Sequence, residues 1–271
     1  PVVIFEQEEK TFTQVANSYL EAETGWWFSI EQGDFDQDGD MDYVLGNLGL
    51  NYKYKASPER PFSIYAGDLD DNGNSDIVLS YYNDDTQFPV RGLQCSSEQM
   101  PGIKQKFVNY SEFAISPIEK VYGSQVLDQA LQYQATNFAS SYLENLGDGK
   151  FSISALPFEA QFSSVNDIIV DDIDGDDKLD LVIAGNLHSS EVETTRNDAS
   201  IGLFLHGLGD GRFTPVPYRQ SGLMIRENVK KLKSIETPEG RFFAVGNNDG
   251  TLQLIKANQD KRAKQHLTTR E

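Results

Sequence analysis

Aspartates gathered in three short runs are the residues of this chain with the clearest chemistry. Each run fits the pattern Asp-x-Asp-x-Asp/Asn-(Gly)-x-x-Asp, in which alternate side chains of a tight loop point to a common centre. Positions 1, 3, 5 and 9 supply side-chain oxygens, and position 7 adds a backbone carbonyl. This donor set matches the roughly six to eight hard oxygens that Ca²⁺ prefers, whereas Mg²⁺ tends to keep its waters.

The predicted calcium ligands are assigned loop by loop. In the first loop they are Asp34, Asp36, Asp38 and Asp42, with the carbonyl of Asp40. In the second loop they are Asp68, Asp70, Asn72 and Asp76, with the carbonyl of Asn74. In the third loop they are Asp172, Asp174, Asp176 and Asp180, with the carbonyl of Lys178. The sequence therefore predicts two to three bound Ca²⁺ ions, and zinc is disfavoured because no loop contains His or Cys.

The turn residue at position 6 differs among the loops. It is Gly39 in the first loop and Gly73 in the second, but Asp177 in the third. Asp tolerates the left-handed backbone region better than most residues, at some cost. We therefore expect the third site to be weaker or its turn to be altered.

An EF-hand begins with the same pattern but needs a Glu at position 12 and flanking helices. Position 12 is apolar in all three loops: Leu45, Leu79 and Ile183. Each of these residues lies in a β-rich run. The loops are therefore predicted to join two strands rather than two helices.

Strand signals dominate the rest of the chain. Short β-rich runs bounded by Gly, Asn and Asp are typical of a sandwich, barrel or propeller. Residues 96–131 break this pattern with helical spacing, and Pro101 and Pro117 are placed to open helices. The sequence predicts an all-β fold with a helical insertion at 96–131.

Two sequence units repeat, and they carry a family resemblance. One is Gly33–Asn47, which recurs at Gly67–Ser80 and Asp171–Asn186, and the other is Asn145–Phe151, which recurs at Gly207–Phe213. Together they resemble the FG-GAP/VCBS repeats of integrin-α-like β-propellers, especially the carboxy-terminal part of Bacteroidetes-type VCBS-repeat proteins. The resemblance covers about residues 25–258. It implies a bladed fold, calcium between two strands, and an exported protein that is periplasmic, outer-membrane-attached or extracellular.

The number of blades is open on the sequence alone. We find about four units, the last of which (Val229–Lys256) has no acidic loop and is expected to be a blade without calcium. A further strand is predicted at Thr11–Val15. Either the chain is part of a larger ring, or this strand completes the last unit and closes a small ring. The predicted domain is 1–258, followed by a polar tail at 259–271.

Composition limits the possible partners. The chain has 271 residues, 42 Asp and Glu against 23 Lys and Arg, and a formal charge of −19. This charge disfavours nucleic acid and anionic membranes, and no apolar run is long enough for a transmembrane helix. The first residue is not Met and no signal peptide is evident, so we expect the chain to be a processed product or part of a larger chain.

Signals of catalysis are few. The histidines are His188, His206 and His266, and no nucleophile elbow or phosphate loop is present. We interpret His206 as structural. The predicted function is a non-catalytic, calcium-stabilised module for binding, adhesion or assembly, with a protein or glycan ligand and the helical insertion as the candidate partner site. The alternative is a scaffold or catalytic domain of a polysaccharide-acting enzyme.

Overall fold

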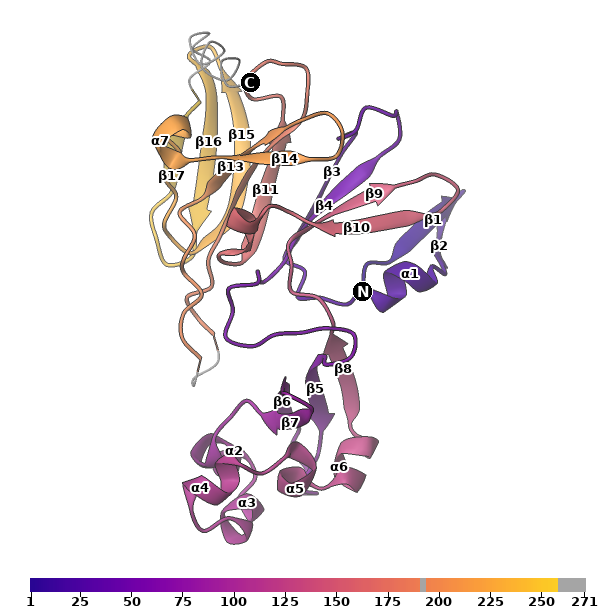
Figure 1. Ribbon diagram of the computed structural model, residues 1–271, viewed down its shortest axis with the longest axis vertical. Coiled ribbons are helices and arrows are strands. Elements are labelled where there is room, and N and C mark those ends of the chain that lie inside the picture. The colour runs from indigo at the N-terminus through magenta and orange to yellow at the C-terminus, as the bar shows by residue number, and fades with distance from the viewer. Residues whose placement is uncertain (191–193, 258–271) are drawn as a thin grey trace. The chain divides into compact units, whose positions relative to one another are not determined.

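Antiparallel sheets make up most of the structure, a computed structural model that describes residues 1–190 and 194–257 (Figure 1). The all-β prediction is confirmed, and none of the sheets in these residues closes into a barrel. The chain forms two compact units. Unit 1 consists of Pro1–Trp26 and Lys53–Phe138 with residues 194–195, and unit 2 of Trp27–Tyr52, Ala139–Ser190 and the described chain from Arg196 onward. The predicted polar tail lies outside the described residues.

Unit 2 contains three antiparallel sheets. The first has the spatial order β3 (Ser29–Gly33), β4 (Asp42–Gly46), β9 (Ser141–Asn145), β10 (Phe151–Ala155). The second is β11 (Val165–Asp171), β12 (Asp180–Gly185), β13 (Leu203–Gly207), β14 (Phe213–Val216). The third is β15 (Val229–Thr237), β16 (Gly240–Asn247), β17 (Gln253–Lys256). Two short helices accompany them, the 3₁₀ helix Phe158–Gln161 and α7 (Tyr218–Ser221).

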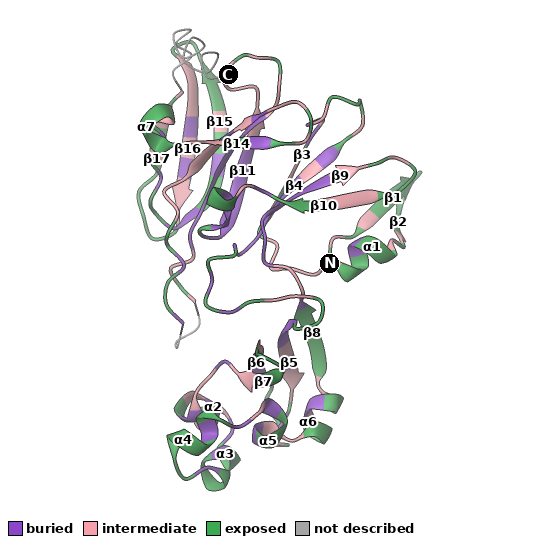
Figure 2. Ribbon diagram, in the orientation of Figure 1, coloured by how far each residue is buried: buried purple, intermediate pink, exposed green. Residues whose placement is uncertain are grey.

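The second sheet of unit 2 is buried on both faces (Figure 2). Successive residues of a strand point to opposite faces. Ile168 accordingly packs in one core with Val44 of the first sheet, and Ile169 packs in another core with Val245 of the third sheet. This two-sided burial explains why the segments Ile168–Val170 of β11 and Leu181–Ala184 of β12 are continuous apolar runs rather than alternating ones.

The first sheet of unit 2 is interrupted in sequence. Its second strand ends at Gly46 and its third begins at Ser141, yet the two pair directly, with Tyr43 opposite Leu143 and Leu45 opposite Ser141. Most of unit 1 lies between them in the chain. The second acidic loop therefore belongs to a segment inserted within the first repeat. It is not part of a repeat that comes after the first one in the chain.

Unit 1 is built on one four-stranded sheet with a helical cover. The strand order is β7 (Thr86–Pro89), β6 (Asp76–Asn83), β5 (Phe62–Gly67), β8 (Leu131–Ala135). Five short helices lie between β7 and β8 in the chain: α2 (Leu93–Gln99), α3 (Gly102–Lys106), α4 (Tyr110–Ala114), α5 (Ile118–Tyr122) and α6 (Ser124–Gln129). As predicted, Pro101 and Pro117 directly precede helices, α3 and α5.

The apolar residues of the helical insertion mostly form a core with their own sheet. Phe107 and Ile118 are almost fully buried and share a cluster with Tyr65 and Val78 of the sheet. The helical spacing in the sequence therefore reflects this packing. Val108 and Ile115, by contrast, are 89% and 77% exposed.

The amino-terminal strands pair with each other. The predicted strand Thr11–Val15 is β2, and it forms a hairpin with β1 (Ile4–Glu8), in which Ile4 lies opposite Val15. Helix α1 (Ser18–Ala22) follows, and the side chain of Asn17 caps it by accepting from the Leu20 N–H. The third sheet of unit 2 contains three strands in the described residues.

Candidate metal centres in the acidic loops

Each acidic loop joins the first and second strands of its sheet. The first connects β3 to β4, the second β5 to β6, and the third β11 to β12. At position 2 each loop carries an apolar residue that packs inward. Phe35 is 3% exposed, Leu69 is 7% exposed, and Ile173 packs against the core between the second and third sheets. This residue anchors the loop and leaves the flanking acidic side chains at positions 1 and 3 free to converge.

The three loops share one backbone conformation. Positions 4 and 6 have positive φ in every loop, with values of +64° and +95° at Gln37 and Gly39, +58° and +86° at Asp71 and Gly73, and +75° and +67° at Gly175 and Asp177. The third loop thus has its glycine at position 4, and Asp177 adopts the left-handed conformation expected of it. Its turn keeps the φ signs of the other two.

The closing carboxylate at position 9 is buried in all three loops. Asp42, Asp76 and Asp180 are 0%, 3% and 0% exposed. In each case Oδ2 accepts a hydrogen bond from the backbone N–H of position 2, at 3.3, 3.0 and 3.1 Å respectively. These bonds fix the direction of the carboxylate, and no Lys or Arg forms an ion pair with any of the three within the described chain.

In the first loop, oxygens of Asp34, Asp36 and Asp38 lie within 4.8 Å of one another. Oδ1 of Asp34 and Oδ1 of Asp40 are buried and have no hydrogen-bond partner in the structure. The backbone of position 7 is hydrogen-bonded within the loop, because the N–H of Asp40 donates to Oδ1 of Asp38 at 2.9 Å. Desolvation is the largest cause that raises the pKa of Asp36 and of Asp40, and neighbouring carboxylates add to it.

In the second loop, oxygens of Asp68, Asp70 and Asp76 come together. Oδ1 of Asp70 is buried without a partner. Asn72 is oriented by Asn74, whose backbone N–H and side-chain amide both donate to its Oδ1 at 2.8 Å. The carboxylate of Asp68 accepts hydrogen bonds from the backbone N–H groups of Asn72 and Gly73. Hydrogen bonds within the loop thus orient the side chains of both Asp68 and Asn72.

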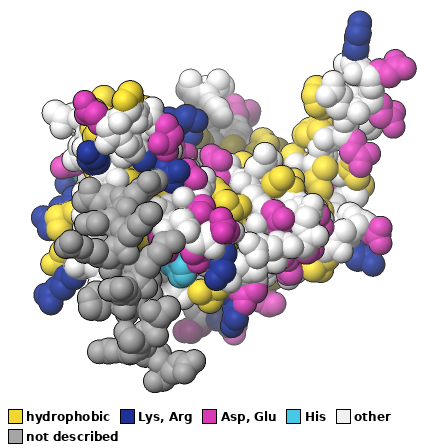
Figure 3. Space-filling view, turned by 90° about the horizontal axis from the view of Figure 1, so that it is seen from above, with side chains coloured by type: hydrophobic (Ala, Val, Ile, Leu, Met, Phe, Trp, Pro, Cys, Tyr) yellow, Lys and Arg dark blue, Asp and Glu magenta, His cyan; other side chains and the backbone are white. Residues whose placement is uncertain are grey.

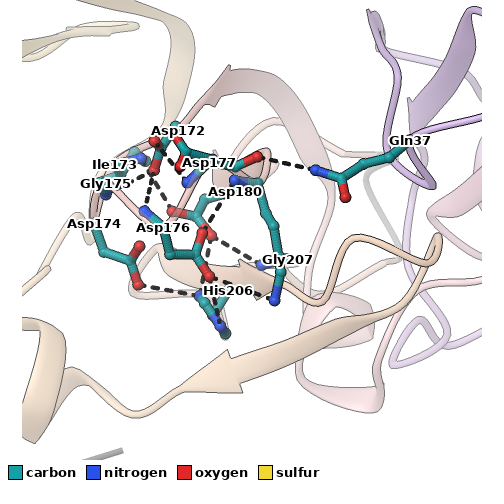
Figure 4. Close-up of polar contacts among 11 residues, drawn as sticks. Gln37, Asp172, Ile173, Asp174, Gly175, Asp176, Asp177, Asp180, His206 and Gly207 are labelled. Atoms are coloured by element: carbon teal, nitrogen blue, oxygen red, sulfur yellow. Dashed lines mark hydrogen bonds and ion pairs between the residues drawn. The ribbon is translucent and has the colours of Figure 1, made fainter. Parts of the chain in front are cut away.

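The third loop brings together Asp172, Asp174 and Asp176 (Figure 4). The backbone N–H of Lys178 donates to Oδ1 of Asp176 at 3.1 Å, and its ammonium lies 3.6 Å from Oδ2 of the same residue. Oδ1 of Asp174 is buried and has no partner. The first and third loops are also joined, because the side-chain amide of Gln37 donates to the carbonyl of Asp177 at 3.0 Å.

The third strand in each of the first two unit 2 sheets adds a residue that the loop pattern does not reveal. His206 on β13 has Nδ1 3.2 Å from Oδ2 of Asp174 and 3.3 Å from Oδ1 of Asp180. Glu144 on β9 lies opposite Asp42 by the register of β4 and β9. Burial raises its pKa, and the charges of Asp36 and Asp42 add to this. Both residues precede the motif repeated at Asn145–Phe151 and Gly207–Phe213, so aligning those repeats would have revealed them.

Two carboxyl groups of the third loop, those of Asp174 and Asp180, have raised pKa values. Burial raises the pKa of Asp180 to about 6, despite the N–H groups of Gly207 and Ile173 that donate to it. Burial also raises the pKa of Asp174, and the charge of Asp176 adds to this. A cation among these oxygens would favour their charged forms and reverse the shifts. Converging, partly unsatisfied oxygens of this kind are suited to binding a hard divalent cation.

On the face in Figure 3, acidic side chains are interspersed with basic ones. None of the helices in the described part of the chain has the length and hydropathy needed to cross a bilayer.

Neither known protein families nor curated proteins give a match to this chain. The repeated loop geometry is therefore the main basis for a functional conclusion.

Proposed function

We propose that the chain is a calcium-binding, non-catalytic module whose three acidic loops hold two to three Ca²⁺ ions. The observation that carries this proposal is the recurrence of one loop geometry in three sheets. Each loop has a buried closing carboxylate and at least one buried carboxylate oxygen without a hydrogen-bond partner. Unpaired buried carboxylate oxygens are costly, and a bound cation is the simplest way to satisfy them.

Calcium is favoured over other divalent ions by the donors. The predicted ligands of the first two loops are oxygens without exception, which disfavours zinc. Up to four side-chain oxygens and a carbonyl per loop exceed what Mg²⁺ usually takes from protein, because that ion keeps several waters. The proposed role of the ion is structural. It neutralises a carboxylate cluster and fixes the loop between two strands, so that binding adds to the free energy of folding.

We further propose that unit 2 is a set of propeller blades of the FG-GAP/VCBS type. Its sheets follow one another by face-to-face packing, with Ile168 in one interface and Ile169 in the next. Its first two sheets are four-stranded and share the positions of the acidic loop and of the Gly-Asp-Gly hairpin, at residues 147–149 and 209–211. A module of this kind would serve binding, adhesion or assembly in an exported protein, where Ca²⁺ is abundant enough for sites of modest affinity.

Calorimetric titration and thermal unfolding test the calcium assignment. We expect two to three equivalents of Ca²⁺ to bind and the melting temperature to fall when excess EGTA removes them. Adding back Mg²⁺ at the same concentration should restore little of the loss. An unchanged melting temperature in EGTA, together with no heat of Ca²⁺ binding, would overturn the proposal. Depolymerisation assays on polysaccharides, with and without Ca²⁺, test the enzymatic alternative.

A further inference from the structure

The third loop has a donor that the other two lack, the imidazole of His206. Its Nδ1 atom is buried and is not aligned for a hydrogen bond, but it lies within ion-pair distance of carboxylate oxygens of Asp174 and Asp180, at 3.2 and 3.3 Å. The side chain as a whole is 17% exposed. A nitrogen and two carboxylate oxygens that converge in this way form a donor set on which a metal ion can close.

We infer that Asp174, Asp180 and His206 bind a divalent transition-metal ion, so that the third loop is selective for a metal different from that of the first two. This inference rests on the proposed function, since it assumes that the loops are metal sites. Beyond that function, we infer that the third-strand residue, Glu144 in the first loop and His206 in the third, decides which metal is bound. Calcium takes oxygen ligands, whereas an imidazole nitrogen suits zinc and other first-row transition metals.

The separations of the three donors fit such an ion. Two ligands held about 2.0–2.1 Å from a tetrahedral metal lie about 3.3–3.4 Å apart. The distances from Nδ1 of His206 to the oxygens of Asp174 and Asp180 are close to this value. All three donors lie within 4.8 Å of one another. The site therefore needs little rearrangement to close on a small cation.

The surroundings hold these donors in place. Oδ1 of Asp180 accepts from the N–H of Gly207 at 2.9 Å, and Oδ2 accepts from the N–H of Ile173, so its orientation is fixed from both sides (Figure 4). His206 comes from β13, whose pairing with β12 places Leu205 opposite Leu181. Continuing that register places His206 opposite Asp180. A selective metal site requires ligands that are held in a fixed orientation by hydrogen bonds from the surrounding residues.

The first loop provides an internal comparison. Tyr43 lies opposite Leu143 in its sheet, so Glu144 is opposite Asp42 as His206 is opposite Asp180. The N–H of the next residue, Asn145, donates to Oδ1 of Asp42 at 2.9 Å, just as Gly207 donates to Asp180. The two loops therefore differ at this place in chemistry, carboxylate against imidazole, but not in position. Exchanging these residues should exchange the metal preference.

The test uses the full chain without a polyhistidine tag and the metals Zn²⁺ and Co²⁺, with Ca²⁺ present at about 1 mM. We expect one equivalent of Zn²⁺ to bind in competition with a chromophoric chelator. The Co²⁺ form should show the hyperfine-shifted proton resonances of one coordinated imidazole. His206→Gln should weaken Zn²⁺ binding at least about tenfold and abolish those resonances. The matched controls His188→Gln and His266→Gln should leave both unchanged.

A gain of function guards against loss through misfolding. His206→Glu should convert the third loop to Ca²⁺, and Glu144→His should create a second Zn²⁺ site in the first loop. Unchanged Zn²⁺ affinity in His206→Gln, or a Co²⁺ form without an imidazole signal, would overturn the inference. Binding of three equivalents of Ca²⁺ and no Zn²⁺ would also overturn the inference, but it would leave the proposed function intact. Failure of every loop to bind any of these metals would overturn both.

Discussion

The hydroxyl of Tyr142 donates a 2.6 Å hydrogen bond to Oδ2 of Asp42, the residue that closes the first acidic loop. The N–H of Asn145 donates to the other oxygen of the same carboxylate. Both donors belong to β9, which follows the inserted unit 1 in the chain, whereas Asp42 begins β4 before it. The geometry of the first loop therefore depends on a strand that is distant in sequence. Burial, followed by the bond to Asp42, raises the pKa of Tyr142 and keeps it a donor.

Replacing Tyr142 with Phe should destabilise unit 2. The substitution removes one donor from a fully buried carboxylate and keeps the ring that packs against Phe35. We expect the free energy of unfolding to fall by about 1–3 kcal/mol, measured by urea denaturation. The loss should be larger without Ca²⁺, because the carboxylate then has fewer partners. Tyr218→Phe, at a ring that is 44% exposed, is the control and should change little. Equal effects at the two positions would contradict the prediction.

Neutralising the closing carboxylate should remove one ion at a time. Asp42→Asn, Asp76→Asn and Asp180→Asn each replace a buried carboxylate at position 9 of one loop. Calorimetry should show one bound divalent ion fewer in each variant and little change at the other two loops. Asp84→Asn, in the exposed turn between β6 and β7, is the matched control and should bind as the parent does. The independence of the sites fails if one substitution abolishes all binding.

The left-handed residue of the third loop should tolerate Asn but not a β-branched side chain. Asp177 has φ of +67°, and its side chain is not among the predicted ligands. Asp177→Asn should leave metal binding at this loop within about twofold, since Asn also adopts this region. Asp177→Ile should cost about 1–2 kcal/mol of stability and weaken binding. Thermal unfolding and titration of the pair would reveal this difference, and a harmless Ile would disprove the conformational argument.

The metal-free protein should lose stability as the pH rises. The pKa of Asp180 is about 6 in the folded protein and near 3.8 when unfolded, so the folded state holds its proton over this interval while the unfolded state has lost it. This contribution is fully present below pH 3.8 and disappears as the pH passes 6. A shift of this size corresponds to about 3 kcal/mol.

Urea denaturation in metal-free buffer from about pH 4.5 to 7.5 measures this trend. Asp180→Asn should flatten it, because the amide does not titrate. With a divalent ion bound at the third loop the trend should reverse, since the ion binds the ionised carboxylate. A metal-free protein that becomes more stable toward neutral pH, with the Asn variant behaving identically, would show that Asp180 does not govern the effect.

Local sequence was enough to predict several of the strands, the start of two helices and the strand-connecting loops. The strands β4, β5, β6, β11 and β12 coincide with apolar runs that follow or precede the aspartates, because both signals arise within a few residues. Helices α3 and α5 begin after Pro101 and Pro117 for the same reason. The left-handed conformation of Asp177 also followed from its place in a repeated pattern.

Long-range pairing was not accessible in this way. The sequence alone placed Asp42 in a loop, but the pairing of β4 with β9 across the inserted unit brought Tyr142, Asn145 and Glu144 to it. His206 read as an isolated structural residue, because strand register is set by the packing of whole sheets and leaves no mark on the residues nearby. The sequence thus determined which oxygens each loop offers. Only the tertiary structure decided which third-strand residue lies opposite the closing carboxylate, Glu144 with an oxygen donor in the first loop and His206 with a nitrogen donor in the third.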